Sequence, residues 1–347
     1  MNGSPTVQVE NLVKVYPKDV KAVNGISFNV AKGEFFGILG PNGAGKSTTM
    51  KIMATLLRKT SGKVVVGGHD VDHTQMEIRR TMGFAMQEVG LDDLAKGRDF
   101  LVTQGLLYGL TRKASQTRTT ELLELVGLTD AASRKVGTYS GGMRRRLDLA
   151  SALIHNPPIL FLDEPTTGLD PQSRLAIWKH LEELNRSGTT VILTTQIMEE
   201  ADRLCHRIAI IDQGLIVAQG TPKSLKAEVG GDVVTLSFSG DVTPGAQSPA
   251  DQAKALLPGQ PYVLSVTAPN AAGTQISVTV RNGGEVVPDL MRFLGNSGIA
   301  VSNLSLASPT LDDVFLKYTG HKIRTDSTTG EELGQAMKAM LGVNSRR

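Results

Sequence analysis

The segment Gly40–Thr48, GPNGAGKST, has the residue types and spacing of a phosphate-binding loop. It follows an apolar run, Phe35–Leu39, and precedes a helix that we expect from Thr49 to Leu57. Glycines let several backbone N–H groups approach a phosphate closely, and the helix directs its positive N-terminus at the same point. The lysine places a charge between the β- and γ-phosphates, and the serine hydroxyl is a ligand for bridging Mg²⁺. The residues expected to bind nucleotide here are Gly40, Pro41, Asn42, Gly43, Ala44, Gly45, Lys46, Ser47 and Thr48.

Two adjacent carboxylates follow a second apolar run. Ile159–Leu162 is typical of a fully buried parallel strand, and it ends in Asp163 and Glu164. Asp163 can hold Mg²⁺ through its water shell, and Glu164 can polarise an attacking water. The alternative is a pair of solvated acids that open the turn at Pro165–Pro171. The upstream phosphate loop favours the catalytic interpretation because phosphoryl transfer needs such an acid.

A serine and two glycines begin a second helix. Ser140, Gly141, Gly142 and Met143 precede a helical pattern that continues to Leu153, and they form another anion site by the same backbone and dipole physics. One triphosphate needs one such site per chain, so the second site suggests that two chains share a nucleotide. The three arginines that follow, 144–146, are either a nucleic-acid patch or a solvated helix face, and a single short run favours the solvated face.

Three further side chains have positions suited to contact with a nucleotide or its metal ion. Tyr16 precedes a polar turn, where its ring can stack on a purine, although a half-buried strand tyrosine is an equal alternative. Gln87 ends the strand predicted at Met82–Met86, so its amide oxygen can ligate Mg²⁺ or orient a water; in isolation it is an ordinary surface residue. Gln196 ends the strand predicted at Thr190–Thr195.

Composition narrows the class of protein. The 347 residues predict a large domain and a smaller one, and 37 basic against 34 acidic residues give a formal charge of +3, too near balance to indicate a nucleic-acid partner. A single cysteine, Cys205, excludes an intramolecular disulfide framework and is expected to be a small buried apolar residue. No apolar run approaches the ~18 residues of a membrane span, and the first residues lack a secretory pattern, so we expect a cytoplasmic chain.

The order of these motifs resembles the nucleotide-binding subunit of ATP-binding-cassette (ABC) transporters over about residues 7–225. Gly40–Thr48 resembles the Walker A loop, Gln87 the Q-loop, Ser140–Met143 the signature motif and Ile159–Glu164 the Walker B strand with its catalytic glutamate. The resemblance adds Asp170 of the D-loop and Tyr16, which matches the adenine-stacking aromatic. The resemblance implies that the chain binds ATP and Mg²⁺. It implies that the catalytic residues are Glu164, Gln196 and Lys46. It implies that the metal ligands are Ser47, Gln87 and Asp163.

Two positions differ from the usual pattern of that family. Met143 stands where glutamine is usual, although the Ser-Gly-Gly core is intact, and Gln196 stands where a switch histidine is usual. A glutamine amide can donate a hydrogen bond to the γ-phosphate, but it does not change charge near neutral pH. We therefore expect slow hydrolysis, while Glu164 indicates an active enzyme.

Three features resemble the daunorubicin/doxorubicin-resistance branch of the family. They are YSGGMRRR at 139–146, the Thr-Thr-Gln end of the Thr190 strand, and SPTLDDVFL at 308–316. This resemblance implies export of a hydrophobic drug or natural product by a homodimer bound to an integral membrane permease on the inner face of the cell membrane. The alternatives are an ABC ATPase that acts on nucleic acid or ribosomes and a slow or non-hydrolysing regulator.

The fold class implied is α/β, a P-loop NTPase of the ABC type. Residues 1–228 are expected to form the cassette, with a mixed sheet core, an antiparallel edge sheet and a helical subdomain at about 88–155. Residues 229–320 show the order βαββαβ, a split-βαβ pattern, and we expect an α+β regulatory or dimerisation domain there. An amphipathic helix is predicted at Leu311–Tyr318, and residues 321–347 are expected to be a tail.

Overall fold

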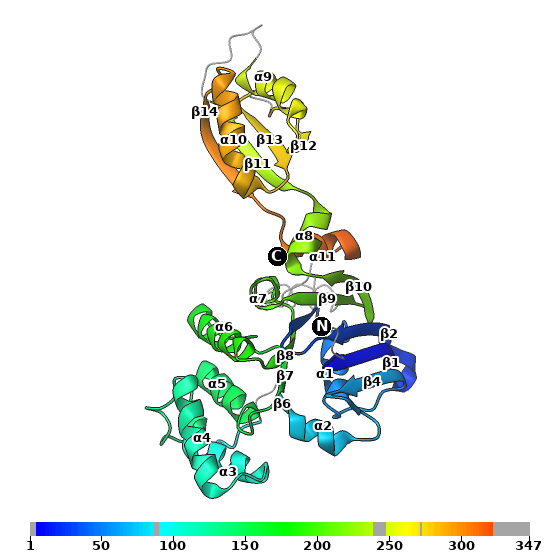
Figure 1. Cartoon of the computed structure of the whole chain (residues 1–347), viewed down its shortest axis with the longest axis vertical. Helices are drawn as coiled ribbons and strands as arrows, with labels where there is room; N and C mark the ends of the chain where they lie inside the picture. The colour runs from blue at the N-terminus through cyan, green and yellow to red at the C-terminus, as the bar shows by residue number, and fades with distance from the viewer. Residues whose placement is uncertain (1–4, 87–89, 239–247, 271–272, 322–347) are drawn as a thin grey trace, which may run out of the picture. The chain divides into compact units, whose positions relative to one another are not determined.

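The structure is a computed structural model that describes residues 5–86, 90–238, 248–270 and 273–321 (Figure 1). It has two compact units. Of the described residues, the first comprises 5–222 and 318–321, and the second lies within Lys223–Lys317. Each unit is described by itself below.

A six-stranded sheet forms the centre of the first unit. Its order is β10-β9-β3-β8-β7-β6; neighbours from β9 to β6 are parallel, and β10 pairs antiparallel with β9 at one edge. Every residue of β3, β7 and β8 is buried, which explains their continuous apolar sequences. The strands are β3 (Phe35–Leu39), β6 (Met82–Ala85), β7 (Ile159–Asp163), β8 (Thr190–Thr195), β9 (Arg207–Asp212) and β10 (Leu215–Gly220).

A four-stranded antiparallel sheet lies beside it, in the order β2-β1-β4-β5. Its strands are β1 (Val7–Tyr16), β2 (Val20–Val30), β4 (Ser61–Val66) and β5 (His69–Asp70). A 3₁₀ turn at Pro17–Asp19 joins β1 to β2. The helix α1 (Lys46–Met53) contributes Met50, Ile52 and Met53 to a core that also contains inward residues of both sheets. The phosphate loop is thereby attached to the main hydrophobic core of the unit.

Helices complete the first unit. Figure 1 shows α3 (Gly97–Leu107), α4 (Arg112–Leu125) and α5 (Gly141–Ala152) gathered into one helical lobe, as the sequence predicts. Thr111 caps α4 and Ser140 caps α5, each accepting a hydrogen bond from the backbone N–H three residues later. The remaining helices are α2 (Gln75–Thr81), α6 (Pro171–Arg186) and α7 (Met198–Leu204).

The second unit is a four-stranded antiparallel sheet with two helices packed on it. The order β12-β13-β11-β14 places β13 beside β11, so each βαβ crossover spans an inserted strand and the split-βαβ prediction is confirmed. Leu236, Ile276 and Leu290 belong to its own hydrophobic core. Its elements are α8 (Pro222–Val229), β11 (Asp232–Phe238), α9 (Pro249–Leu256), a 3₁₀ turn at Leu257–Gly259, β12 (Val263–Val266), β13 (Gln275–Val280), α10 (Gly283–Asn296), β14 (Val301–Ala307) and α11 (Leu311–Thr319).

Two sequence predictions about local structure were wrong. The helix predicted at Thr49–Leu57 begins at Lys46, because Gly45 takes the left-handed N-cap conformation (φ 103°), and it ends at Met53, shortly before Thr55 at φ 60°. The arginine run is not a uniformly solvated face, because Arg145 is only 6% exposed. Its charge lies inside the cassette.

One other expectation was confirmed. Cys205 is a free and buried thiol, and burial raises its pKa well above the ordinary value. Within the described ranges, no helix combines the length and apolar character required to cross a bilayer.

Candidate functional site

The predicted site residues follow the carboxyl ends of three neighbouring strands. In the order β3-β8-β7, Leu39 is paired with Thr195 and Asp163 with Thr194, so the phosphate loop, Gln196 and the acidic pair leave one edge of the sheet together. Ligands of open α/β sheets bind outside this edge. The topology thus brings together three segments that are far apart in sequence.

Two glycines of the phosphate loop have no space for a side chain. A Cβ at Gly40 would lie 2.1 Å from the Ile211 carbonyl oxygen, and one at Gly45 would lie 2.3 Å from the Ala22 carbonyl oxygen. Gly43 is different, because it has positive φ but open space around its Cβ position. The loop therefore needs glycine at its ends for packing and in its middle for backbone conformation.

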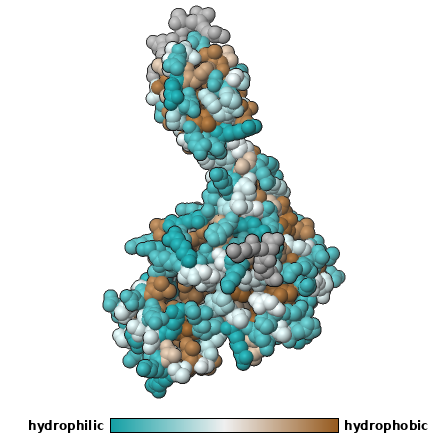
Figure 2. Space-filling model, viewed as in Figure 1, coloured by the Kyte–Doolittle hydropathy of each residue, from teal (hydrophilic) through white to brown (hydrophobic). Residues whose placement is uncertain are grey.

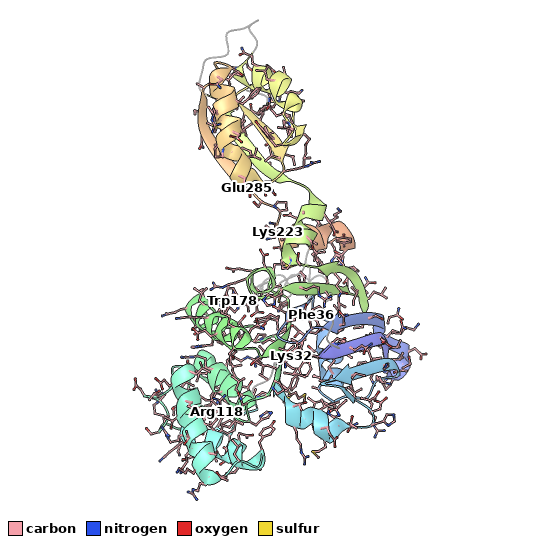
Figure 3. The ribbon with its side chains drawn as sticks, viewed as in Figure 1. Lys32, Phe36, Arg118, Trp178, Lys223 and Glu285 are labelled. Atoms are coloured by element: carbon pink, nitrogen blue, oxygen red, sulfur yellow. The ribbon has the colours of Figure 1, made fainter. Side chains whose placement is uncertain are left out.

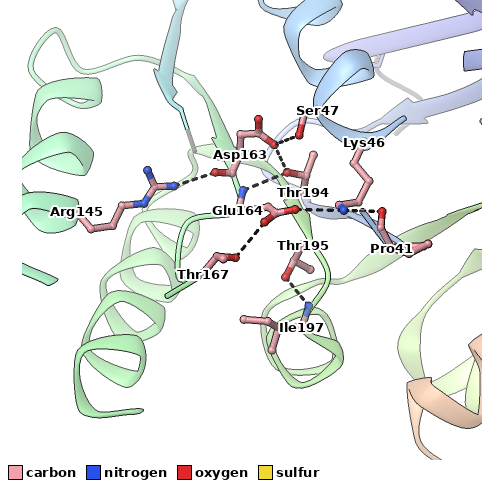
Figure 4. A network of polar contacts seen from close by, with 10 residues as sticks. All are labelled: Pro41, Lys46, Ser47, Arg145, Asp163, Glu164, Thr167, Thr194, Thr195 and Ile197. Atoms are coloured by element: carbon pink, nitrogen blue, oxygen red, sulfur yellow. Dashed lines mark hydrogen bonds and ion pairs between the residues drawn. The ribbon is translucent and has the colours of Figure 1, made fainter. Parts of the chain in front are cut away.

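The lysine of the loop is buried and already paired. Lys46 Nζ lies 3.2 Å from Glu164 Oε1 and 3.0 Å from the Pro41 carbonyl oxygen, as Figure 4 shows. Both charged side chains are 3% exposed. A buried charge whose partner is removed costs several kcal/mol, about 3–5 in measured cases. The two residues expected to act on a nucleotide thus neutralise each other in the structure.

Asp163 lies beside the hydroxyl predicted to share a metal with it. Ser47 Oγ donates to Asp163 Oδ1 at 2.9 Å, and the Thr194 hydroxyl donates to the same oxygen. A carboxylate and a hydroxyl at a phosphate loop are hard oxygen ligands, so the residues present fit Mg²⁺. Gln87, the third predicted ligand, lies outside the described residues.

The backbone of Glu164 has an unusual conformation. Its φ is 49°, which is sparsely populated by residues with a side chain. Its N–H donates to both oxygens of Thr194, at 3.1 Å each, and Thr167 Oγ1 donates to its Oε2 at 3.1 Å. Strain of this kind persists where the surroundings fix it, and it gathers at functional sites. Sequence reasoning missed Thr194 and Thr167, because a threonine in a strand or turn gives no distinctive signal.

Gln196 extends the site from the end of β8. Its side-chain Oε1 is buried, and no hydrogen-bond partner for it is found in the part of the chain that the structure describes. Buried amide oxygens are nearly always hydrogen-bonded, by protein, water or ligand. This oxygen is therefore a candidate acceptor for a water or ligand at the sheet edge.

Glu200, on α7, was not predicted. It is fully buried, and its Oε1 accepts hydrogen bonds from Thr166 Oγ1 at 2.7 Å and from Trp178 Nε1 at 2.9 Å. Figure 3 shows Trp178 on α6, so this carboxyl joins the turn after Glu164, α6 and α7. Burial raises its pKa, the hydrogen bonds opposing this effect. The apolar and acidic composition of 198–204 predicts the helix but not this inward carboxyl.

Tyr16 reaches the end of the phosphate loop. Its hydroxyl oxygen lies 3.5 Å from Thr48 Oγ1, and Lys14 Nζ lies 5.2 Å from its ring centroid. As the last residue of β1, it projects a half-buried ring next to the helix that follows the loop. This position is consistent with base stacking beside a bound phosphate chain.

The second glycine pair forms a different kind of helix end. Ser140 and Gly141 are exposed, and the Ser140 hydroxyl accepts from the Met143 N–H at 3.3 Å. Gly142 is buried, and a Cβ there would lie 2.6 Å from Ser173 Oγ. Asp170 caps α6 by accepting from the Ser173 N–H at 2.9 Å, and hydrogen bonding from Ser173 lowers its pKa. The signature and D-loop segments are thus neighbours, both at exposed helix starts.

The fold and the arrangement of these residues define the ATP-hydrolysing cassette of ABC transporters. A family model described as "ABC transporter" matches residues 23–167, and one described as "ATP-binding protein DrrA1-3-like, C-terminal domain" matches residues 220–319. The ATP-binding cassette MJ0796, solved as a post-hydrolysis dimer with ADP and phosphate, is 28% identical with a TM-score of 0.58, covering 62% of this chain and 98% of that one.

Curated relatives cover nearly the whole chain. Daunorubicin resistance ATP-binding protein DrrA2 of Streptomyces coeruleorubidus is 41% identical, covering 94% of this chain and 98% of its own length. Daunorubicin/doxorubicin resistance ATP-binding protein DrrA of Streptomyces peucetius is 42% identical, covering 97% and 99%. Linearmycin resistance ATP-binding protein LnrL of Bacillus subtilis is 38% identical, covering 92% and 99%. The chain belongs to the DrrA-like family of ABC transporter ATP-binding proteins and is an ATPase of the ABC type.

Proposed function

We propose that the chain energises export of a hydrophobic drug or natural product through a separate membrane permease. The observation that carries this proposal is the similarity, over more than nine-tenths of the chain, to ATP-binding proteins named for daunorubicin and doxorubicin resistance. The similar protein named for linearmycin resistance extends the cargo class beyond one compound. The match includes the C-terminal unit, so it goes beyond a general similarity of cassettes.

The working form is a dimer in which two nucleotides lie between two copies. The start of α5, Ser140–Gly142, at which Ser140 and Gly141 are exposed, supplies backbone N–H groups to the nucleotide on the Gly40–Thr48 loop of the other copy. The dimeric state of a similar cassette bound to ADP and phosphate supports this arrangement. ATP then holds the copies together, and loss of the γ-phosphate separates them. The C-terminal unit serves as a regulatory or dimer-stabilising domain.

The roles of the site residues follow from their contacts. Lys46 exchanges its ion pair with Glu164 for the phosphates, which frees the carboxylate to accept a proton from the attacking water. Gln196 donates a hydrogen bond to the γ-phosphate, and Tyr16 stacks on adenine. Ser47 and Asp163, together with Gln87, would hold Mg²⁺, which supplies charge neutralisation between the β- and γ-phosphates.

A membrane partner would bind the helical lobe and the end of β6. Large apolar side chains are exposed there, Leu107 being 75% exposed, and Figure 2 shows hydrophobic atoms among hydrophilic ones on this lobe. Most of these side chains lie on α3 or within three residues of its ends, and exposed apolar groups concentrated on one element mark an interaction surface. This surface would place the chain on the inner face of the cell membrane. Its exposed apolar residues are Met86, Leu94, Leu106, Leu107 and Tyr108.

Two alternative functions are separated by measurement. A cassette acting on nucleic acid or ribosomes would have its ATPase stimulated by RNA or DNA, which the near-balanced charge does not favour. A non-hydrolysing regulator, suggested by Gln196, would release no phosphate. An assay of phosphate release by the purified chain, with and without nucleic acid, tests both.

The export function is tested in a drug-sensitive host. The chain is expressed with a candidate permease, and retention of fluorescent daunorubicin is measured against the same pair carrying Glu164→Gln. We expect lower drug retention for the unaltered pair only. Equal retention for both pairs, with daunorubicin and with linearmycin, would reject the proposed cargo class.

A further inference from the structure

Arg145 is the buried member of the arginine run on α5. Its neighbours lie toward the outside of the lobe: Arg144 pairs with exposed Asp93, and Arg146 Nη1 donates to the Val126 carbonyl oxygen at 2.9 Å. Arg145 instead points from α5 toward the ends of β6 and β7. Of the three consecutive arginines, Arg145 therefore reaches the edge of the sheet at which the candidate site lies.

The guanidinium of Arg145 binds three backbone carbonyls. Nη2 donates to the Asp163 oxygen at 2.9 Å, as Figure 4 shows, Nε donates to the Pro165 oxygen at 2.7 Å, and Nη1 donates to the Met86 oxygen. Nη1 also lies 3.3 Å from Asp148 Oδ2, one turn along α5. The planar fork of arginine, with five N–H donors in fixed directions, suits this set of acceptors, whereas lysine offers one point charge.

Two of these carbonyls flank the strained glutamate. Asp163 and Pro165 lie immediately before and after Glu164, whose φ is 49°. The Glu164 N–H is fixed separately by Thr194. Arg145 therefore holds the carbonyl of the peptide that precedes Glu164 and the carbonyl of the next residue, Pro165, so the backbone around Glu164 is fixed by the position of Arg145.

The same helix carries the exposed anion site. Arg145 lies four residues after Gly141, which is about 6 Å along a helix axis. A helical turn is stiff on this scale, so a displacement of the Ser140 end moves the guanidinium with it. The guanidinium also binds the Met86 carbonyl oxygen, so the end of β6 is held by the same side chain as the end of β7.

We propose that Arg145 is a positioning residue that couples the Ser140–Gly142 end of α5 to the catalytic orientation of Glu164 in the same chain. The inference rests on the proposed nucleotide sandwich. In that dimer, the Ser140 end of a chain contacts one nucleotide and its Glu164 serves the other. Arg145 then makes each hydrolysis site sensitive to occupancy of its neighbour, so the two nucleotides are hydrolysed cooperatively.

The test compares Arg145→Lys with Arg146→Lys in the purified full-length chain. The change is identical and the two sites are adjacent on α5, but Arg146 binds the carbonyls of Val126 and Gly127 and, at 3.4 Å within its own helix, that of Gly142, and none of these adjoins Glu164. For Arg145→Lys we expect unchanged binding of a fluorescent ATP analogue and a kcat lower by about 10²-fold, the effect of a small misplacement of a catalytic group. We also expect the Hill coefficient for ATP to fall from about 2 toward 1, while Arg146→Lys keeps it.

Three results would overturn the inference. They are an unchanged kcat and Hill coefficient in Arg145→Lys, an equal loss in Arg146→Lys, and a parallel loss of ATP affinity, which marks a merely structural role. Should Arg145→Lys fail to fold, Arg145→Gln with Asp148→Asn, which removes the Asp148 carboxylate together with its cation, is measured against Asp148→Asn alone, with the same expectations.

The design separates this inference from the function on which it rests. A wild-type chain that shows no cooperativity, and no ATP-dependent dimer when Glu164 is replaced by glutamine, would overturn the sandwich and the coupling together. A wild-type chain that is cooperative, with an Arg145→Lys variant that is equally so, would overturn the coupling alone.

Discussion

The two glycine-containing helix starts of the cassette differ in how complete they are. At the start of α1, Lys46 is buried, paired with Glu164 and bonded to the Pro41 carbonyl. At the start of α5, Ser140 and Gly141 are exposed, and the serine caps its own helix. The same backbone physics gives both ends an affinity for anions.

The difference shows which of the two anion sites a single chain completes by itself. The α1 end has its charges neutralised internally, so a nucleotide must exchange one set of contacts for another. The α5 end leaves its first residues open to a partner, so its anion site is complete only when something is brought to it. Substitutions at α1 should therefore affect chemistry and folding stability, while those at the tip of α5 should affect assembly.

Glu164→Gln gives the largest expected effect and isolates the α1 end. An amide cannot accept the proton of the attacking water, so ATP turnover should fall by about 10²–10⁴-fold. The α5 end is untouched, so ATP should still produce a dimer, now long-lived. Phosphate release measures ATP turnover, and light scattering measures the dimer.

Glu199→Gln is the matched control, because Glu199 is an exposed glutamate on α7, and it should leave ATP turnover unchanged. Retention of a tenth or more of turnover in Glu164→Gln would remove Glu164 as the base.

Lys46→Ala tests whether the α1 end is internally neutralised. Removal of the ammonium leaves the Glu164 carboxylate buried without its cation, which costs about 3 kcal/mol of folding stability. ATP affinity should fall by about 10–100-fold with the loss of a charge-assisted bond to phosphate. Urea unfolding and fluorescent-nucleotide titration measure these quantities.

The double variant Lys46→Ala with Glu164→Gln separates the two effects. Because the neutral amide no longer needs a cation, the double variant should regain most of the lost stability but none of the ATP affinity. If stability remains low in the double variant, the Lys46–Glu164 pair is not the source of the loss.

Most of this architecture is predictable from sequence because it rests on local patterns. The spacing of Gly40, Gly45 and Lys46 requires a strand before and a helix after, and the structure has both. Continuous apolar runs correctly indicated the buried strands β7 and β8, and period-two alternation indicated the edge sheet. The βαββαβ order of the second unit followed from the same signals.

Long-range contacts of single side chains were not predictable in this way. Arg145 has the same local context as Arg144 and Arg146, and only the packing of α5 against two strand ends distinguishes it. The Lys46–Glu164 pair depends on β3 and β7 lying on either side of β8 in the sheet, which a linear motif does not encode. Glu200 was hidden because its helix has a polar sequence.

Ser140→Ala sharpens the comparison at the α5 end. Loss of the cap costs about 1 kcal/mol of folding stability. Thr111→Ala is the matched control, since Thr111 caps α4 of the same lobe. Its hydroxyl oxygen lies 3.2 Å from the Ala114 nitrogen, and that of Ser140 lies 3.3 Å from the Met143 nitrogen. Both variants should lose similar stability, but only Ser140→Ala should weaken the ATP-dependent dimer, by about 10-fold for one lost hydrogen bond to a charged group. Equal dimerisation, measured by light scattering in a Glu164→Gln background, would mean that the α5 tip does not contact nucleotide.

Asp148→Asn gives the smallest expected effect and concerns the buried part of α5, about two turns beyond the exposed tip. Burial raises the pKa of Asp148 from 3.8 to about 6, against the opposing effect of Arg145. Because the folded state holds this proton more tightly than the unfolded state, the stabilisation is complete below pH ~4 and is lost as pH rises through ~6. Asparagine resembles the neutral acid, so Asp148→Asn should be more stable at pH 7 by on the order of 1 kcal/mol and lose this slope between pH ~4 and ~6. Asp93→Asn is the control, because Asp93 is an exposed carboxylate that pairs with Arg144, on the same helix as Asp148. This change should alter folding stability by less than about 0.5 kcal/mol at every pH. Urea unfolding across that pH range measures both variants, and an unchanged slope in Asp148→Asn would show that its carboxyl does not titrate as its burial demands.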